Sequence, residues 1–465
     1  MELEKWYRSK VKRLQLVYDR MPLFVRAALV TVRGLSLAMN RYARSTYEDL
    51  EQLKSHDRWS RQEIEQQQIS NLQRIFDVAR GCSPFYSGYP PLRLTSLSEW
   101  SQLPVISREI VREMGPAMLN VTIRERDRIW VATTGTTGAG LKVCYTPAVM
   151  RKNWAFRMQQ FLWAGIRPRS PRITAFGSQV VSSRQKSPPY WVRNSAENQI
   201  LVSIFHLSSS TAADYVAFLR QHANRVLEGF PSALGLLANF VLAAGAPIPM
   251  RAVFTDGEPL LPTLREMIES AFCTRVFNTY GNTELCGLIQ QCEHQGMHLN
   301  SDYGFLEILD NDGRPVEKGE TGYLVWTGFI NDSMPLLRYR IGDRGAWLAL
   351  QECPCGRKSA LVDPGVSRES DLLYAADGRV FSPRAVNQVL KAATAFRFCQ
   401  FVQRQKGHVL VRAVGGGMRA QQELSGVRQG IVSLLGASTT VEAELASEPI
   451  VTRGGKTPLV VRERN

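Results

Sequence analysis

The sequence predicts an α/β protein in which a large domain of mixed sheets and flanking helices precedes a small α+β domain. Between residues 129 and 280, short apolar runs alternate with segments of helical spacing, a pattern typical of crossover units and a largely parallel sheet. After Asn300 the pattern changes to hairpins, and Asp312 and Gly313 are suited to a tight turn. From Leu372 onward the chain has its own set of expected strands and helices, enough for a compact domain.

The elements follow in order along the chain. Residues 46–80 are charged and Gln-rich with apolar positions at helical spacing, and the Gly and Pro residues of segment 81–92 end this helical region. Buried strands are expected where about four to eight apolar residues stand together, and helices where apolar positions recur every three or four residues. This predicts strands at 129–134, 173–177, 200–207, 225–230, 251–256 and 275–280, and helices at 147–161, 211–221, 232–244 and 261–271.

The pattern divides the 465 residues into three parts. We expect a basic helical extension at 1–90 that packs on the large domain, the large domain itself at 91–371, and a small mobile lid domain at 372–465. The composition, with 44% hydrophobic and 21% charged residues, is that of a globular chain. It excludes a disordered protein, a fibrous protein and a polytopic membrane protein.

The net charge of +15 is concentrated near the N-terminus, where residues 1–44 contain ten Lys or Arg but three Asp or Glu. Residues 21–40 are mostly apolar, but Arg26 and Arg33 interrupt them, which argues against a membrane-spanning helix. The charged opening is too long for a secretory signal, so we expect the chain in the cytoplasm. A solvated helical extension is favoured, and two other interpretations stay open: an amphipathic helix at the inner face of an anionic membrane, and a basic arm for nucleic acid.

Four potential zinc ligands stand in two short segments. Cys292 and His298 lie in QCEHQGMH, and Cys353 and Cys355 lie in ECPCGR. Disulfides are not expected in a reducing compartment, and three thiolates with one imidazole complete a closed tetrahedral zinc site if the two segments meet. His294 is a competing ligand, and unligated buried cysteines are the alternative.

The segment VATTGTTGAGLKV directly follows an expected strand. Its glycines permit a close approach of the backbone to a ligand, and its N–H groups and threonine hydroxyls can cradle phosphates. It is not a Walker loop, because G-x-x-x-x-G-K-[ST] is absent. The residues that would form the cradle are Thr133, Thr134, Gly135, Thr136, Thr137 and Gly138.

Three further motifs place polar residues at the carboxyl ends of strands, where open α/β sheets bind ligands. VFTDGEPL presents the Asp-Gly-Glu turn of residues 256–258. In VFNTYGNTELCG, Tyr280 can stack on a purine and Glu284 can hold Mg²⁺ beside a polyphosphate. In LRYRIGDRG, Asp343 can accept hydrogen bonds from both hydroxyls of a ribose.

The order of these motifs resembles the adenylate-forming superfamily of acyl-CoA synthetases, peptide-synthetase adenylation domains and luciferases. The resemblance spans residues 130 to 460 and is greatest to the phenylacetate-CoA ligase branch and its capsule-biosynthesis relatives. It also rests on the basic helical N-terminal region, on the EGFPSAL segment and on the Cys, His, Cys, Cys set. Several members of that branch have a structural zinc at such residues, so the resemblance favours the zinc interpretation.

The resemblance implies a nucleotide site built from residues of the large domain and of the small domain. The loop 133–138 would hold pyrophosphate. The adenine wall would consist of Asp256, Gly257, Glu258, Asn278, Thr279, Tyr280 and Gly281.

The remaining roles also follow from the resemblance. Thr283 would contact the α-phosphate, Glu284 would bind Mg²⁺ and Asp343 would hold the ribose. Arg368 would contact the ribose and a phosphate next to a hinge at residue 371, and Lys456 would be the catalytic lysine of the lid. The acyl pocket is expected near Trp154, Phe230 and Pro231.

The implied activity is that of an AMP-forming acid ligase that uses ATP, Mg²⁺ and a structural Zn²⁺. A carboxylic acid of aryl, acyl or amino acid type would become an acyl-adenylate with release of pyrophosphate, and would then pass to a thiol of coenzyme A or of a carrier protein. Transfer to an amine or hydroxyl in polysaccharide or secondary metabolism is the alternative. The chain departs from the family at Gly140, Ser370 and residues 374–377, and these departures bear on the thioester-forming conformation rather than on adenylation.

A basic membrane-surface or nucleic-acid-binding protein with a zinc knuckle is the alternative of another class. Nucleic acid is disfavoured, because aromatic residues do not alternate with basic ones near the cysteines. The sequence leaves the oligomeric state open, a homodimer included.

Overall fold

The structure is a computed structural model. It describes residues 17–18, 21–132, 141–182, 185–349, 352–368, 372–381, 386, 389–390, 395–396, 398–452 and 455–462, with only the backbone described at 364–368 and 380. The described chain is a mixed α/β fold, as the sequence predicts.

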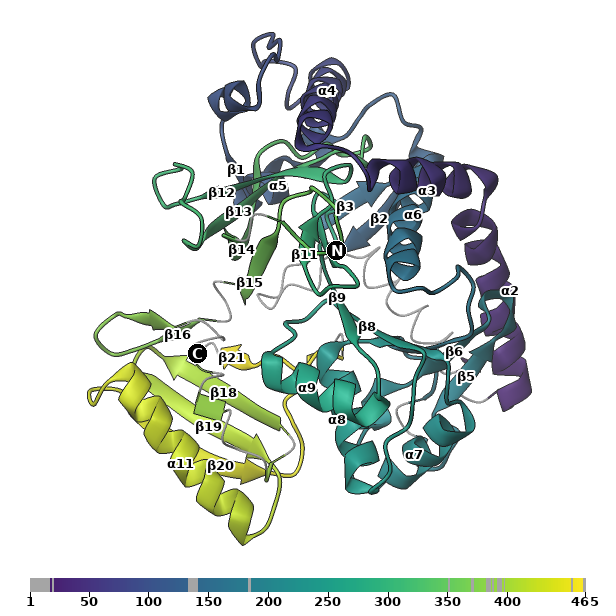
Figure 1. The fold of residues 1–465 in the computed structure, drawn as a ribbon, viewed down its shortest axis with the longest axis vertical. Coiled ribbons are helices and arrows are strands. Elements are labelled where there is room, and N and C mark those ends of the chain that lie inside the picture. Colours follow the sequence, from purple (N-terminus) through teal and green to yellow (C-terminus); the bar gives the residue numbers. More distant parts are fainter. Residues whose placement is uncertain are drawn as a thin grey trace.

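An eight-stranded sheet lies at the centre of the larger part of the molecule (Figure 1). Its strand order is β11-β10-β9-β8-β7-β4-β6-β5. Strands β9, β8, β7, β4 and β6 are parallel, whereas β5 at one edge and β10 and β11 at the other pair antiparallel. The strands are β4 (Arg172–Ala175), β5 (Trp191–Asn194), β6 (Gln199–Val202), β7 (Val226–Gly229), β8 (Ala252–Asp256), β9 (Val276–Gly281), β10 (Leu288–Gln291) and β11 (Met297–Leu299).

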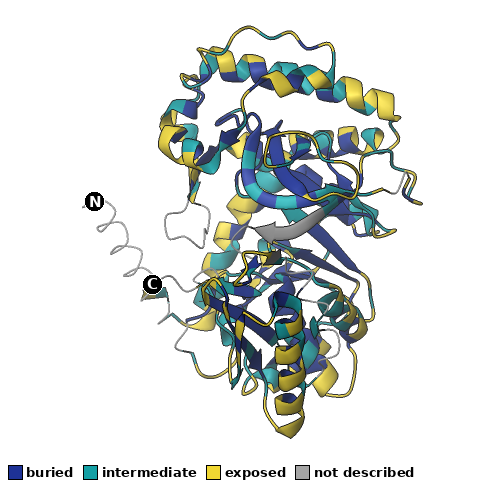
Figure 2. Ribbon diagram, turned by 90° about the vertical axis from the view of Figure 1, so that its left-hand side faces the viewer, coloured by how far each residue is buried: buried dark blue, intermediate teal, exposed yellow. Residues whose placement is uncertain are grey.

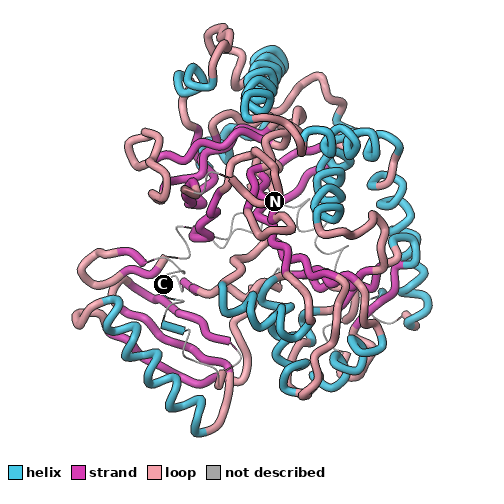
Figure 3. Tube along the Cα trace, in the orientation of Figure 1, coloured by secondary structure: helices cyan, strands magenta, loops and turns pink. Residues whose placement is uncertain are grey.

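Helices cover both faces of this sheet (Figure 3). Leu227 and Val253 share one core with three helices, and Val226 and Phe254 share another with Phe161. Neighbouring residues of a strand point to opposite faces, so the helix of Phe161 lies opposite the other three. The first set comprises α7 (Ala212–Gln221), α8 (Pro231–Ala243) and α9 (Pro262–Phe272), and the opposite helix is α6 (Pro147–Trp163).

A second sheet of five strands lies beside the first. Its order is β1-β14-β13-β12, and β15 also pairs with β14. The expected hairpins are present, with Gly313 at φ +80° in the turn after β12. The strands are β1 (Ile106–Ser107), β12 (Gly304–Leu309), β13 (Gly322–Gly328), β14 (Tyr339–Trp347) and β15 (Val362–Arg368).

The N-terminal helices pack on the larger part of the molecule. Leu50, Leu72 and Phe76 belong to the same buried core as Trp326 and Tyr339 of the second sheet. Capping by Ser60 and Glu63 starts the longest of these helices. The helices are α2 (Leu23–Arg41), α3 (Arg44–His56), α4 (Arg61–Cys82) and α5 (Arg108–Met114).

Helix α2 lies along the edge of the central sheet beside β5 (Figure 1). A Cβ atom on Gly34 would lie 2.1 Å from Oδ1 of Asn194, so the helix backbone touches the sheet. Arg41 forms an ion pair of 2.9 Å with the buried Glu197. By length and apolar composition alone α2 could cross a membrane, but in the structure one side of it is docked on the protein.

The C-terminal part has a hydrophobic core of its own, which includes Phe401, Val411 and Ile431. Its four-stranded sheet has the order β20-β19-β18-β21, and one helix packs on it. Figure 2 shows the buried residues concentrated in the sheets and the exposed ones along the outer faces of helices. The elements are β16 (Leu373–Tyr374), β17 (Val380–Phe381), β18 (Phe398–Gln405), β19 (His408–Val414), α11 (Met418–Leu435), β20 (Thr440–Ala446) and β21 (Val460–Arg462).

Two strand predictions need correction. The segment at 129–134 does not join the parallel sheet: β2 (Ile129–Ala132) pairs antiparallel with β3 (Lys142–Tyr145) alone. The chain returns within ten residues, whereas a crossover between parallel strands needs about a dozen or more. The segment at 200–207 is a strand only as far as Val202, and a 3₁₀ turn at Ile204–His206 follows.

Candidate active site

Lys456 lies at the junction between the C-terminal part and the central sheet. Its ammonium donates a hydrogen bond to the carbonyl oxygen of Gly257, which follows β8. The turn before Lys456 packs tightly, because a Cβ atom on Gly455 would lie 2.6 Å from Cδ1 of Ile204. Gly455 also has φ +80°, a conformation that favours glycine. The structure thus brings together the predicted lysine and the predicted Asp-Gly-Glu turn, 199 residues apart in the chain.

Glu258 connects the same two parts through its carboxylate. One oxygen accepts a hydrogen bond of 3.0 Å from the N–H of Ser232, in the first turn of α8. The other accepts a hydrogen bond of 3.0 Å from the N–H of Thr457. A carboxylate at a helix N-terminus is stabilised by the helix dipole, and here it also fixes the residue after Lys456.

The turn is partly exposed, with Gly257 at the surface and Asp256 and Glu258 half-buried. Burial raises the pKa of Asp256 and of Glu258, although the charge of Lys456 opposes both shifts. The ammonium of Lys456 lies 5.3 Å from the ring centroid of Phe230, and that ring contacts Phe176 edge to face. A lysine at such a half-buried position interacts with a developing negative charge more strongly than one in bulk water.

Tyr280 and Asp343 meet across the two sheets. The hydroxyl of Tyr280, near the end of β9, donates a hydrogen bond of 2.7 Å to Oδ2 of Asp343 on β14. The ring of Tyr280 also stacks on Trp326, with 6.3 Å between centroids. In the pairing of β14 with β15, Asp343 stands opposite Arg368, so the backbone places the predicted ribose and phosphate contacts side by side.

Glu284 is buried, with 3% of its surface exposed, and already has partners. Its Oε1 lies 3.3 Å from a guanidinium nitrogen of Arg108 and accepts a hydrogen bond of 3.1 Å from the hydroxyl of Tyr339. Burial raises the pKa of Glu284, and the charge of Arg108 opposes that shift. Next to it, the carbonyl of Thr283 accepts a hydrogen bond from the hydroxyl of Tyr145.

Asn278 and Thr279 use their side chains inside the protein. Oδ1 of Asn278 accepts a hydrogen bond of 2.9 Å from Thr255, and the hydroxyl of Thr279 donates one of 2.8 Å to Gln160. Both residues are buried, so of the predicted adenine wall on β9 only Tyr280 and Gly281 are partly exposed.

Some predicted residues lie outside the described part of the chain. These are Thr133, Thr134, Gly135, Thr136, Thr137 and Gly138, which connect β2 to β3, and the hinge residue Asp371. Of Arg368 only the backbone is described.

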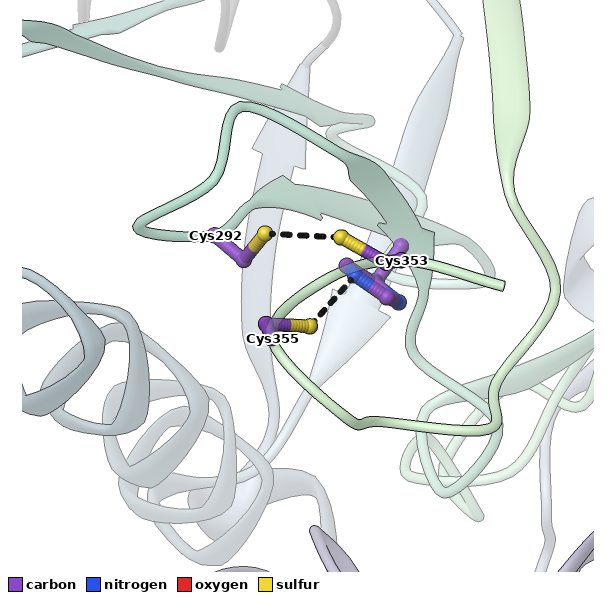
Figure 4. A group of neighbouring side chains, drawn as sticks. Cys292, Cys353 and Cys355 are labelled. Carbon is purple, nitrogen blue, oxygen red and sulfur yellow. Dashed lines mark hydrogen bonds between the residues drawn. The ribbon is translucent and has the colours of Figure 1, made fainter. Parts of the chain in front are cut away.

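The four predicted metal ligands come together at the edge of the central sheet. Cys292 follows β10, His298 lies on β11, and Cys353 and Cys355 lie in the loop before β15. Their four ligand atoms lie within 4.8 Å of one another. The sulfur atoms of Cys292 and Cys353 are 3.6 Å apart, and Sγ of Cys355 is 3.3 Å from Nε2 of His298. Figure 4 shows the labelled cysteines pointing into one common space.

The groups around this cluster favour a neutral imidazole and a compact site. Nδ1 of His298 lies 3.0 Å from the hydroxyl of Ser359, which leaves Nε2 directed at the thiols. Burial and the charge of Arg357 lower the pKa of His298 to about 4. A Cβ atom on Gly296 would lie 2.8 Å from Sγ of Cys353, so only glycine fits there. The cluster thus has the ligand types, the spacing and the supporting hydrogen bond of a closed tetrahedral zinc site, without His294 among the grouped ligands.

Sequence reasoning missed several residues of the site. Arg108 stands in no motif, and Tyr339 lies in LRYRIGDRG without a sign of its partner, because only the tertiary fold brings both residues to Glu284. Trp154, which was expected in the acyl pocket, contacts the ring of Tyr42 and stacks with the guanidinium of Arg41 at 4.2 Å, beneath the N-terminal helices. Phe230 does lie beside Lys456.

A buried ionic network also escaped prediction. Glu228 at the end of β7 pairs with Arg157 at 3.2 Å and with Arg172 at 3.2 Å. The charges of the two arginines lower the pKa of Glu228 against the effect of burial. The network holds the strand ends beneath the Asp-Gly-Glu turn in place.

No protein-family model matches the chain. Protein CapK of Staphylococcus aureus is 23% identical over 468 aligned residues, which cover 95% of this chain and 98% of that protein. Phenylacetate-coenzyme A ligase of Thermus thermophilus is 24% identical and covers 75% of this chain and 80% of its own length.

The fold is also that of a solved ligase. The crystal structure of 2-hydroxyisobutyryl-CoA ligase in the postadenylation state has a TM-score of 0.69 at 18% identity, covering 88% of this chain and 91% of the other. The same ligase in the thioesterification state, with coenzyme A, has a TM-score of 0.56. Two similarities thus agree with the motif order: sequence similarity over most of the chain, and a shared fold. Over most of its length the chain is thus similar in sequence to CapK and the phenylacetate-CoA ligases, and it shares the fold of an adenylate-forming ligase.

Proposed function

We propose that the protein is an AMP-forming acid ligase that activates a carboxylic acid with ATP. The observation that supports this most directly is the contact of Lys456 with Gly257, beside the Tyr280–Asp343 pair. The similarity to ligases that act on phenylacetate and on 2-hydroxyisobutyrate supports a small organic acid as substrate.

The reaction is an in-line displacement at phosphorus. A carboxylate oxygen of the acid forms a bond to the α-phosphorus of ATP, the bond from that phosphorus to the bridging oxygen breaks, and pyrophosphate leaves. The protein contributes position and charge rather than a covalent intermediate. Lys456 would neutralise the charge that develops on the phosphoryl oxygens.

Tyr280 and Asp343 would hold the nucleoside. The half-exposed ring of Tyr280 offers a face for the adenine, and the carboxylate of Asp343 can accept hydrogen bonds from ribose hydroxyls. Arg368, opposite Asp343 in the sheet, would reach the ribose and a phosphate.

Glu284 fits a Mg²⁺ ion in ligand type, since Mg²⁺ prefers carboxylate oxygens and phosphates. Arg108 and Tyr339 both contact Oε1, so Oε2 would be the oxygen that holds the ion. The ion would offset phosphate charge when bound. Arg108 would share this task, because its guanidinium lies at the same carboxylate.

We also propose that Cys292, His298, Cys353 and Cys355 hold a structural Zn²⁺. The observations that support it are the mutual spacing of the ligand atoms and the contact of Nδ1 of His298 with the hydroxyl of Ser359, to which a metal-bound imidazole would donate its N–H. A zinc-knuckle role in nucleic-acid binding is disfavoured, because three of the four ligands are buried.

The acyl group would next pass to a thiol, of coenzyme A or of a carrier protein. An amine or hydroxyl acceptor is the second candidate, favoured by the chain's own Ser370 and residues 374–377 after the hinge, which depart from the thioester-forming relatives, and by the similarity to CapK over almost the whole length. We expect either reaction to take place in the cytoplasm.

A pyrophosphate-release screen tests these proposals. The full-length protein is incubated with ATP, Mg²⁺ and panels of aryl, fatty, hydroxy and amino acids, with and without coenzyme A. Release with an acid but not without it supports adenylation, and formation of acyl-CoA identifies the thiol acceptor. Absence of release with every acid, from protein that binds ATP, would contradict the proposed function.

A further inference from the structure

One side of α2 is apolar and has no partner within the described chain. Phe24, Val32, Leu35 and Met39 are 75%, 64%, 52% and 78% exposed. Their spacing of eight, three and four residues places them in one row along the helix, and Ala28 fills the gap. We call these five residues the apolar row. Exposed apolar rows of this length are uncommon on soluble monomers and mark interaction surfaces.

The apolar row continues into a groove at the start of the helix. The groove has a volume of about 360 Å³ and lies between α2 and strands β5 and β6. Leu23, Phe24 and Trp191 form its apolar lining. Its polar lining includes His222, Arg193 and Arg225.

The groove is positively charged. Within the described ranges, no carboxylate forms an ion pair with Arg193 or Arg225. Burial lowers the pKa of His222, and the charges of Arg225 and Arg193, which lie close to it, lower that pKa further. Helix α2 contains Arg26, Arg33 and Arg41 and no acidic residue, and the sequence before Leu23 contains six further Lys or Arg.

We propose that the apolar row and the arginine groove bind the surface of a phospholipid bilayer with anionic headgroups. The apolar row would enter the boundary between headgroups and acyl chains, and Arg193 and Arg225 would contact phosphates, as in other interfacial amphipathic helices.

The way α2 is fixed decides how it would meet the membrane. Its opposite side is held by the contact of Gly34 with Asn194 and by the ion pair of Arg41 with Glu197. The helix therefore lies flat on the protein, with its row outward, and would lie in the plane of the bilayer rather than across it.

Charge favours a membrane over a second copy of the chain. A symmetric dimer through α2 would bring Arg193 and Arg225 of both copies together, and like charges at an interface repel each other. An anionic bilayer, in contrast, offers an apolar interior to the apolar row and negative headgroups to the positive groove.

The test is sedimentation of the full-length protein with vesicles of phosphatidylcholine alone and of phosphatidylcholine with about 30 mol% phosphatidylglycerol, whose negative surface potential attracts basic segments. We expect binding to the anionic vesicles that weakens with salt, and at least tenfold weaker partition to the neutral ones. F24S/V32S/M39S should lose at least tenfold in partition, and R193Q/R225Q should lose most of the anionic preference. Met418→Ser, which changes an 84% exposed side chain on α11, is the matched control and should bind like the wild type.

Two results would overturn the proposal. One is wild-type protein that stays in the supernatant with both vesicle types. The other is a wild-type dimer in light scattering that F24S/V32S/M39S converts to monomers without any change in vesicle binding, which would assign the face to a second copy. All substituted side chains lie at the surface or in the groove, and unchanged circular dichroism and unchanged pyrophosphate release with an accepted acid would show that the variants are folded.

Discussion

At the scale of single residues, substitutions in the Tyr280–Asp343 pair distinguish two contributions of Asp343 to nucleotide binding. One is its expected contact with the ribose, and the other is the positioning of Tyr280. Asp343→Ala removes the expected ribose acceptor, and charge-assisted hydrogen bonds contribute about 1.5–3 kcal/mol each. We therefore expect KM for ATP to rise about 10- to 100-fold, with a smaller change in kcat. Pyrophosphate-release kinetics with an accepted acid measure this.

Tyr280→Phe is the matched control, because it keeps the ring and removes the hydroxyl that donates a hydrogen bond to Asp343. Its effect on KM should be several times smaller than that of Asp343→Ala. Equal effects of the two substitutions would mean that Asp343 serves only to position Tyr280.

The buried Glu284 gives a pH dependence of stability. Its pKa in the folded protein lies above the usual value of 4.5, because burial disfavours the charge. From about pH 4.5 upward the folded state therefore holds more protons than the unfolded state, and the contribution of Glu284 to stability falls as pH rises. Urea unfolding between pH 4.5 and 7 should show a shallower decline for Glu284→Gln than for the wild type.

Glu63 provides a control of opposite sign. Hydrogen bonds from Ser60 lower its pKa, so its contribution to stability is present above its usual pKa and is lost as pH falls. Glu63→Gln should therefore change the pH slope in the opposite direction, at pH values below about 4.5, when the unfolding series is extended to about pH 3. Parallel slopes for both variants would contradict the assignment for Glu284.

At the scale of elements, the zinc cluster joins the β10–β11 hairpin to the loop that leads into β15. Cys292 and His298 come from one side, Cys353 and Cys355 come from the other, and Cys292 and Cys353 are 61 residues apart. Metal binding therefore closes a long loop. We expect one zinc per chain by mass spectrometry. Cys353→Ser should lose the metal and lower the unfolding temperature by more than about 5 °C.

Cys273→Ser is the control for this prediction, since Cys273 is exposed and lies outside the cluster. It should retain zinc and unfolding temperature. Metal-free wild-type protein, or full zinc content in Cys353→Ser, would contradict the zinc site.

The docking of helix α2 on the sheet requires a glycine at position 34, because a side chain there would collide with Asn194. Any larger residue there must displace Asn194, so Gly34→Leu should destabilise the docked helix by about 1–3 kcal/mol. Limited proteolysis should then cut the chain before residue 44 faster than in the wild type. Ala28→Leu adds the same side chain on the exposed side of the helix and should leave the cleavage rate unchanged.

Sequence patterns predicted elements well where burial alone decides them. The four helices from 147 to 271 begin and end within two residues of the expected positions, because apolar spacing and, in three of them, Pro at the first turn fix them locally. The strand at 129–134 was assigned to the wrong sheet, because an apolar run does not tell which strand it pairs with. Cys292, His298, Cys353 and Cys355 could be grouped from residue type and family resemblance, whereas the pairing of Arg108 with Glu284 depends on tertiary packing and has no local signal.

At the scale of the whole molecule, the position of Lys456 depends on how the C-terminal part docks. The contacts that place it are its own bond to Gly257, the bond from Thr457 to Glu258 and the packing of Gly455 on Ile204. The fold is also more similar to a related ligase in the postadenylation state than in the thioesterification state. The sequence could identify the lysine by its motif, but not the surface it would meet.

This arrangement predicts that Lys456 serves the first half-reaction only. Lys456→Ala should slow pyrophosphate release by at least about 100-fold, because it removes the positive charge placed where negative charge would develop, while the Kd for ATP changes little. When synthetic acyl-adenylate and coenzyme A are supplied instead, acyl-CoA should form within about twofold of the wild-type rate, since a lid that turns away to admit the thiol takes Lys456 with it. Lys406→Ala, on the same part of the chain, should leave both rates unchanged. Equal loss of both half-reactions in Lys456→Ala would contradict this prediction. The lysine would then be needed to position the C-terminal part in both half-reactions.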